Sequence, residues 1–263
     1  MRIAILVLCA LLSLPARAST LLVALEEANN APFEFVDSNG QLTGFHVELI
    51  RAVSSRLGWT LEFERYPWKR AILALELGEV QAVSFVAKNP EREAFALFLP
   101  GNPLHVSRNT LYIKRSRAGE IHYLPDLEQM ARRWRLASPS GYYISEEVNA
   151  MIANGMPIAQ PTVTQSHLFS MLIAERYDAI FGFPYSLSSA SANIPNLDQQ
   201  VQRLDGALIS GASMYLAFSR AAPAQLAEDF AKAYQLFRQD PAYAALAQRF
   251  EVTELLPKPG EFK

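Results

Sequence analysis

Residues 61–85, LEFERYPWKRAILALELGEVQAVSF, decide the fold. The segment opens with the strand-like residues 61–65, of which 61–64 alternate apolar and charged side chains, and it closes with a second strand-like stretch, 80–85, that is mainly apolar. Between them, apolar residues recur at helical spacing after Pro67 and stop at Gly78. A strand, a helix and a second strand in this order predict two parallel strands joined by a crossover helix.

The same alternation extends in both directions from this segment. Residues 21–25 form a short apolar run typical of a buried parallel strand, and 33–45 read as a hairpin that leads into a helix over 47–57. In the second half, 135–138 and 177–182 are strand-like, and helices are expected up to about 154 and over 168–175. Strands that alternate with helices predict an α/β fold with doubly wound, mainly parallel sheets.

Two extended segments, 109–114 and 214–218, flank the second half of the pattern. Apolar residues at helical spacing between 226 and 250 then follow the second segment. We interpret the extended segments as two hinge strands and the terminal helices as a return to the first unit. The expected domains are one lobe of residues 19–112 and 217–263 and a second lobe of residues 113–216.

The N-terminus predicts a cleavable secretory signal peptide over residues 1–18. Arg2 precedes the apolar run 3–14, and the run ends before Ala16-Arg17-Ala18, a typical cleavage site. The single cysteine, Cys9, lies inside that run, so the mature chain is expected to have no disulfide, no thiol catalysis and no cysteine-bound metal. A formal net charge of −2 over 263 residues does not favour nucleic acid as a partner.

An ordered set of short motifs resembles the polar amino-acid family of periplasmic solute-binding proteins that feed ABC importers (the family 3 type). The set runs along almost the whole mature chain and consists of residues 31–33 (APF), 39–45 (NGQLTGF), 77–82 (LGEVQA), 90–92 (PER), 175–179 (ERYDA) and 240–250 (DPAYAALAQRF). The resemblance implies the type II periplasmic-binding-protein fold, with two α/β lobes that enclose a ligand. It also implies a periplasmic, monomeric protein that captures a small polar or anionic solute, such as an amino acid or a related carboxylate.

Three candidate ligand residues come from the first lobe. The resemblance places Arg92 where the family holds a ligand carboxylate, a task that suits the planar donors of a guanidinium. Glu27 follows the first strand and could pair with a cationic group, although Glu26 could be the inward residue instead, because one register step reverses the side chain. Trp68 is expected to form an apolar wall of the site or to pack within the lobe.

The other candidates end strands or follow them. Ser84 and Phe85 are expected to line the floor of the first lobe. Tyr142 and Tyr143, after Gly141, are expected to open a helix of the second lobe, where they could receive an anion or only pack. Phe183 stands where the family places the carboxylate that receives an α-ammonium group. A phenyl ring cannot accept that donor, so a ligand other than a standard α-amino acid is predicted.

The sequence favours a binding protein over an enzyme. His46, His105, His122 and His167 lack the close spacing of a metal site, and no nucleophile elbow or phosphate-binding loop is present. No cofactor is therefore expected. Two alternatives stay open: an enzyme resembling cyclohexadienyl dehydratase, with Glu27 as its acid or base, and a sensory binding protein that presents its ligand to a membrane receptor instead of an ABC permease.

Overall fold

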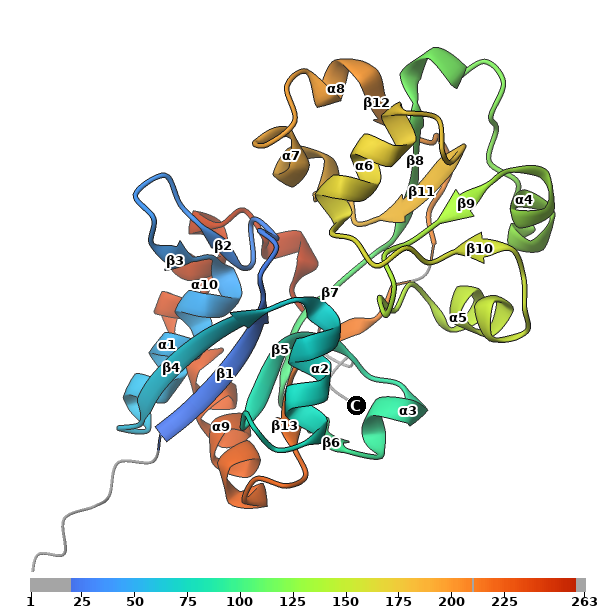
Figure 1. Ribbon diagram of the computed structural model, residues 1–263. Coiled ribbons are helices and arrows are strands. Elements are labelled where there is room, and N and C mark those ends of the chain that lie inside the picture. The colour runs from blue at the N-terminus through green and yellow to red at the C-terminus, as the bar shows by residue number, and fades with distance from the viewer. Residues whose placement is uncertain (1–19, 210, 259–263) are drawn as a thin grey trace, which may run out of the picture.

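The computed structural model describes residues 20–209 and 211–258, which form two lobes, each built on one sheet (Figure 1). The predicted signal peptide lies outside the described residues. The strands of the first lobe are β1 (Thr20–Glu26), β4 (Thr60–Tyr66), β5 (Ala82–Ala87), β6 (Ala96–Leu97), β7 (Pro103–Val106) and β13 (Ser213–Ser219), with the hairpin β2 (Phe35–Val36) and β3 (Leu42–Thr43) beside them. Its helices are α1 (Phe45–Arg56), α2 (Trp68–Glu76), α3 (Pro90–Glu93), α9 (Ala224–Phe237) and α10 (Pro241–Arg249).

The second lobe contains the middle of the chain. Its strands are β8 (Thr110–Lys114), β9 (Leu136–Ala137), β10 (Ile158–Ala159), β11 (Ala179–Gly182) and β12 (Val201–Arg203). Its helices are α4 (Leu127–Arg133), α5 (Glu146–Ala153), α6 (Gln165–Ile173), α7 (Ser186–Ser191) and α8 (Leu197–Gln200). Side chains cap several of these helices as the sequence allows: Ser145 accepts a hydrogen bond from the backbone N–H of Val148, and Thr164 accepts one from that of His167.

The two sheets share one plan. The first has the order β4-β1-β5-β13-β6, and β4, β1 and β5 are parallel while β13 runs antiparallel to β5. The second has the order β10-β9-β11-β8-β12, and β8 runs antiparallel to β11. In each sheet, one strand runs antiparallel to the parallel strands beside it: β13 in the first sheet and β8 in the second. Each of these is the strand by which the chain enters from the other lobe.

The chain crosses between the lobes just before β8 and just before β13. The two crossing segments pair with each other, because the N–H of Ser107 donates to the carbonyl of Ala212 at 3.0 Å and Asn109 forms a bridge with Ile209. The boundaries expected at 112/113 and 216/217 fall inside β8 and β13, each of which lies within a single sheet. We therefore propose hinges where the two crossing segments pair, at Ser107 and Asn109 and opposite them at Ile209 and Ala212.

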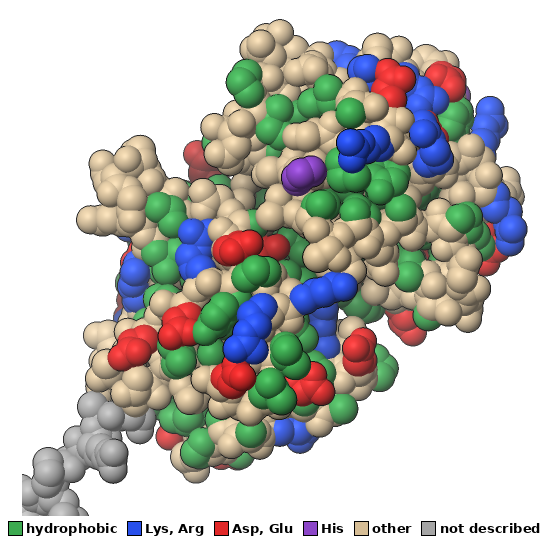
Figure 2. All heavy atoms as spheres, viewed as in Figure 1, with side chains coloured by type: hydrophobic (Ala, Val, Ile, Leu, Met, Phe, Trp, Pro, Cys, Tyr) green, Lys and Arg blue, Asp and Glu red, His purple; other side chains and the backbone are tan. Residues whose placement is uncertain are grey.

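The C-terminal helices return to the first lobe. Phe230 and Tyr234 of α9 and Tyr243 of α10 lie in the same buried cluster as Phe45 and Leu49 of α1. In the space-filling view the two lobes meet along a seam, with acidic and basic side chains interspersed on the first lobe below it (Figure 2). Within residues 20–209 and 211–258, no helix is both long enough and apolar enough to cross a membrane.

Candidate ligand-binding site

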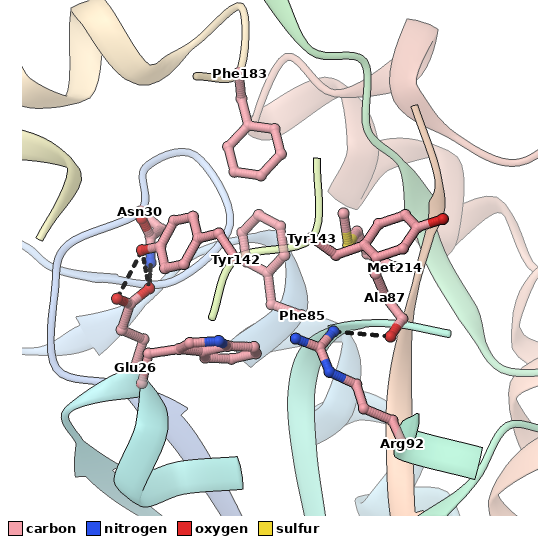
Figure 3. Close-up of a pocket in the computed structure, with 10 residues that line it drawn as sticks. Glu26, Asn30, Phe85, Ala87, Arg92, Tyr142, Tyr143, Phe183 and Met214 are labelled. Carbon is pink, nitrogen blue, oxygen red and sulfur yellow. Dashed lines mark hydrogen bonds between the residues drawn. The ribbon is translucent and has the colours of Figure 1, made fainter. Parts of the chain in front are cut away.

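A cavity of about 30 Å³ lies between the two lobes. Both lobes supply its lining, and the side chains converge on it from opposite sides (Figure 3). The first lobe contributes Glu26, Asn30, Trp68, Phe85, Ala87, Arg92 and Met214, and the second contributes Tyr142, Tyr143 and Phe183. A site with this lining can form completely only when the lobes are close together.

Arg92 is the cation of the cavity and is 7% exposed. It lies in the short helix α3, where Pro90 occupies the first turn and the Asn89 side chain accepts a hydrogen bond from the backbone N–H of Arg92. Its Nη1 donates to the carbonyl of Ala87 at 2.9 Å. Burial lowers the pKa of Arg92 to about 10, so the guanidinium still carries its charge at neutral pH.

Arg92 also reaches across the seam. Its Nη2 donates to the carbonyl of Gly141 at 2.8 Å, and the indole Nε1 of Trp68 donates to the same oxygen at 3.0 Å. Gly141 has φ +81°, which favours glycine, and a Cβ there would lie 3.4 Å from the Trp68 ring. The carbonyl oxygen of Gly141 therefore connects the loop before α5 to the first lobe by two hydrogen bonds beside the cavity.

Glu26, the last residue of β1, is the acid of the cavity (Figure 3). The Tyr142 hydroxyl donates to its carboxylate at 2.7 Å, and Asn30 Nδ2 donates to Oε2 at 2.9 Å. Burial raises the pKa of Glu26 to about 7, and these two hydrogen bonds only partly oppose that effect. The carboxyl group of Glu26 therefore titrates near neutral pH. Its hydrogen bond from the Tyr142 hydroxyl, a neutral donor, links the two lobes.

Aromatic rings form the walls between Arg92 and Glu26. Phe183 lies 5.7 Å from Phe85 and stacks on Tyr185 at 5.3 Å, and Trp68 meets Tyr142 edge to face at 6.1 Å. Phe85 has φ +65°, a left-handed conformation that bulky residues rarely adopt, and β5 and β13 lose register beside it. Such local strain concentrates at functional sites, and here it accompanies a side chain that lines the cavity.

The structure brings six of the eight predicted site residues together: Arg92, Trp68, Phe85, Tyr142, Tyr143 and Phe183 all line the cavity. Glu27 does not, because it is exposed and the preceding residue, Glu26, takes the inward place. Tyr142 and Tyr143 lie in a loop and not at a helix start, since α5 begins at Glu146. The backbone N–H of Tyr142 donates to the carbonyl of Pro139, so what Tyr142 offers the site is its ring and hydroxyl.

Ser84 also lies outside the cavity. It is fully buried, and its Oγ is 3.4 Å from Nδ1 of His46. That ring nitrogen contacts Glu34 Oε1 at 3.0 Å, and His46 Nε2 contacts His105 Nδ1 at 2.9 Å. Ser84 therefore belongs to a buried polar chain behind Phe85, whose ring centroid is 5.2 Å from that of His46.

The sequence did not single out Asn30, Ala87 or Met214. Asn30 follows the first strand in the loop that contains Glu26 and Glu27, so its position after a parallel strand could have drawn attention to it. Ala87 and Met214 carry no chemical signature and lie opposite each other in the pairing of β5 with β13. Within the described ranges no group of three or more histidine, cysteine, aspartate or glutamate side chains is placed to hold a metal ion.

Comparisons with known proteins agree with this architecture. Residues 22–253 match the family described as bacterial extracellular solute-binding proteins, family 3. A segment of 100 residues is 33% identical to a protein of Haemophilus influenzae named as a probable amino-acid ABC transporter-binding protein, and it covers 38% of this chain and 38% of that one. The alignment thus spans little more than a third of the relative's length.

Two solved structures show the same fold over nearly the whole chain. A histidine kinase sensor domain with similarity to periplasmic binding proteins aligns with a TM-score of 0.76 at 21% identity, covering 92% of this chain and 99% of that one. An ancestral arginine-binding protein bound to arginine aligns with a TM-score of 0.72 at 22% identity, covering 88% and 98%. The predicted two-lobed periplasmic-binding-protein fold is confirmed.

Proposed function

The chain belongs to family 3 of the bacterial extracellular solute-binding proteins, and from this premise we propose that it captures a small carboxylate-bearing solute in the periplasm for delivery to an ABC importer. The partial relative from Haemophilus influenzae bears the name of an amino-acid ABC transporter-binding protein, which supports the importer as partner. The sequence-based expectation of secretion supports the compartment.

The observation that carries this proposal is the position of Arg92. A buried guanidinium that lines a cavity is costly unless an anion or hydrogen-bond acceptors compensate it. Two of its five N–H donors go to the carbonyls of Ala87 and Gly141. The remaining donors can bind a carboxylate, and the aromatic walls beside them supply the apolar lining that is typical of small-molecule sites.

A ligand screen tests the proposal directly. The mature protein is heated with a panel of amino acids, carboxylic acids and polyamines, and a ligand that binds only the folded state raises the unfolding midpoint by mass action. We expect carboxylates to raise it and amines without a carboxylate to leave it unchanged. A panel in which only amines act would contradict the proposal.

Glu26 favours one second candidate, an enzyme. A carboxyl group whose pKa lies near neutrality suits general acid or base catalysis. The relative reported above is named as a binding protein, and we infer binding without turnover. Incubation of the bound solute with catalytic amounts of protein separates the two: recovery of the solute unchanged supports the binding protein, and accumulation of a product supports the enzyme.

A further inference from the structure

We propose that Tyr185 couples closure of the lobes to a proton on Glu34: its ring covers the Glu34 carboxyl group only when the lobes meet, so that binding of a solute takes up a proton. Tyr185 belongs to the second lobe and Glu34 to the first. The inference rests on the proposed function, because it concerns closure around the solute that Arg92 holds. It adds a residue that determines the closed state and makes the affinity depend on pH.

Tyr185 directly precedes α7 of the second lobe, but its side chain packs on the first lobe. Its ring meets that of Phe33 edge to face, with 5.0 Å between the centroids, and it packs against the core cluster that contains Phe33. The same ring stacks on Phe183, a wall of the cavity, with 5.3 Å between the centroids and 12° between the planes. Tyr185 therefore contacts both the cavity wall and the interior of the first lobe.

A second contact holds α7 beside the same part of the first lobe. The Ser189 hydroxyl donates to the carbonyl of Asn29 at 2.9 Å. The next residue, Asn30, pairs with Glu34 through two backbone hydrogen bonds, of 2.7 and 3.1 Å. The loop that carries Glu34 thus meets the second lobe at two neighbouring positions, and these contacts are separate from those of Arg92.

Two oxygen atoms at this contact are buried without a partner. Neither the Tyr185 hydroxyl nor Oε2 of Glu34 has a hydrogen-bond partner within the described part of the chain. The other carboxyl oxygen, Oε1, contacts Nδ1 of His46 at 3.0 Å. Burial and, after it, the charge of Glu34 raise the pKa of Tyr185, so the two groups lie close enough to interact. Closure therefore shields Glu34 from water on the side of Tyr185, and this loss of hydration disfavours the carboxylate.

Burial outweighs the charged and polar groups around Glu34. Its titratable neighbours are Glu26 of β1, His46 of α1, Arg65 of β4, His105 of β7, and Tyr142 and Tyr185 of the second lobe. Burial holds the pKa of His46 at about 3 and that of His105 well below its ordinary value, so both rings are neutral near pH 7. The Ser84 hydroxyl and the charge of Arg65 favour the carboxylate, yet the pKa of Glu34 is raised to about 7.

Opening of the lobes reverses the effect of Tyr185. When the second lobe moves away, Tyr185 leaves with it, and water reaches the Glu34 side chain from that side. Hydration favours the carboxylate, so the pKa of Glu34 is lower in the open state than in the closed state. The closed state is thus favoured while Glu34 holds its proton, and this advantage is lost as the pH rises through about 7. A solute that binds the closed state therefore binds more weakly at higher pH.

Spin labels on the two lobes measure closure without any ligand. The single cysteine, Cys9, lies in the predicted signal peptide, so Glu76→Cys and Arg132→Cys give the mature chain one exposed label on each lobe. Pulsed electron paramagnetic resonance then measures the population with the closed distance at about pH 6 and about pH 8.5. We expect a larger closed population at the lower pH, and a smaller difference in Glu34→Gln and in Tyr185→Ala. A difference as large as that of wild type in both variants overturns the inference.

Calorimetry with butanoate measures the same coupling in binding. The dissociation constant of wild type should rise from about pH 6 to about pH 8.5, and Glu34→Gln should make that rise at least about threefold smaller. Tyr185→Ala should act like Glu34→Gln because it uncovers the carboxyl group, whereas Tyr185→Phe keeps the ring and should keep the rise. Glu26 contributes a dependence of the same sign, so the variants and not wild type decide.

Ser189→Ala is the matched control for Tyr185→Ala. It removes the neighbouring contact between the lobes but leaves Glu34 covered, so the rise should equal that of wild type. The same rise in Tyr185→Ala and Ser189→Ala overturns the inference. Cooperative melting curves confirm that each variant is folded, and if Glu34→Gln does not fold, the three variants at Tyr185 and Ser189 decide.

The two measurements separate this inference from the proposed function. If neither butanoate nor any carboxylate of the thermal screen binds, the proposed function is wrong, and the spin labels still decide whether Tyr185 and Glu34 control closure. If Arg92→Ala loses butanoate while Glu34→Gln and Tyr185→Ala keep the pH dependence of wild type, the proposed function holds and the inference is wrong.

Discussion

His46 Nε2 lies 2.9 Å from His105 Nδ1 in the core of the first lobe, and both rings are fully buried. Glu34, 1% exposed, completes a chain of three groups through His46 Nδ1. Burial lowers the pKa of His46 to about 3, lowers that of His105 well below its ordinary value and raises that of Glu34 to about 7, so all three groups are mainly neutral between these two pH values. Glu34, His46 and His105 thus form a connected polar cluster inside an otherwise apolar core, next to the Phe85 ring.

The pH dependence of stability should report the burial of Glu34. The folded pKa is about 7 and the ordinary value is 4.5, so between these values the folded state holds a proton that the unfolded state has lost. The stabilisation by protonated Glu34 is therefore complete below about pH 4.5 and is lost as the pH rises through about 7, an effect on the order of 3 kcal/mol. Glu34→Gln removes this term, so the stability of wild type should fall relative to the variant from about pH 5 to about pH 8. Urea unfolding of both proteins at several pH values measures it, and parallel profiles contradict it.

Replacement of Arg92 should weaken ligand binding strongly. Arg92→Ala removes one partner of a buried charged contact, which costs about 2–5 kcal/mol of binding free energy. Calorimetry with the carboxylate identified by the thermal screen measures the loss. Arg70→Ala is the control, because Arg70 lies on the same lobe but forms an exposed ion pair with Glu79. Equal affinity of Arg92→Ala and Arg70→Ala would show that Arg92 does not contact the ligand.

Substitution of Phe183 should alter the choice between ligands. Phe183→Asp places a carboxylate in the apolar cluster at the Arg92 end, so binding of butanoate should weaken by repulsion while 2-aminobutanoate gains an acceptor for its α-ammonium group. The measured quantity is the ratio of the two dissociation constants. Phe183→Leu, which keeps the wall apolar, should leave the ratio close to that of wild type. An unchanged ratio in Phe183→Asp argues against a place for Phe183 beside the ligand.

The lobes should close on the ligand by bending where the crossing segments pair, near Ser107 and Asn109 and near Ile209 and Ala212. The contacts that cross the seam, such as those of Tyr142 with Glu26 and of Arg92 with Gly141, must break to admit a solute and form again around it. Small-angle scattering should therefore show a smaller radius of gyration at saturating ligand than without ligand. The same radius in both conditions counts against closure.

The sequence determined the elements of the fold, because each element depends on local spacing. The segment 61–85 folds as β4, α2 and β5, as its periodicity predicts. The order of strands does not follow from that spacing: β1 lies between β4 and β5 in the sheet, although it precedes both in the chain. Pairing is decided by contacts between segments far apart in sequence, such as the parallel pairing of β1 with β4.

The same division holds for the site. Arg92, Trp68 and Phe183, which line the cavity, were predicted from the resemblance to the family, whose motifs mark their positions in the sequence. The choice of Glu26 over Glu27 could not be made, since every residue from Val23 to Glu26 is buried and the alternation that reveals a strand's inner face is absent. The contact of His46 with His105 joins residues 59 positions apart in the chain. Local patterns determine which residues form a strand or a helix, but only the packing of distant segments decides which side chains meet and which of them lose contact with water.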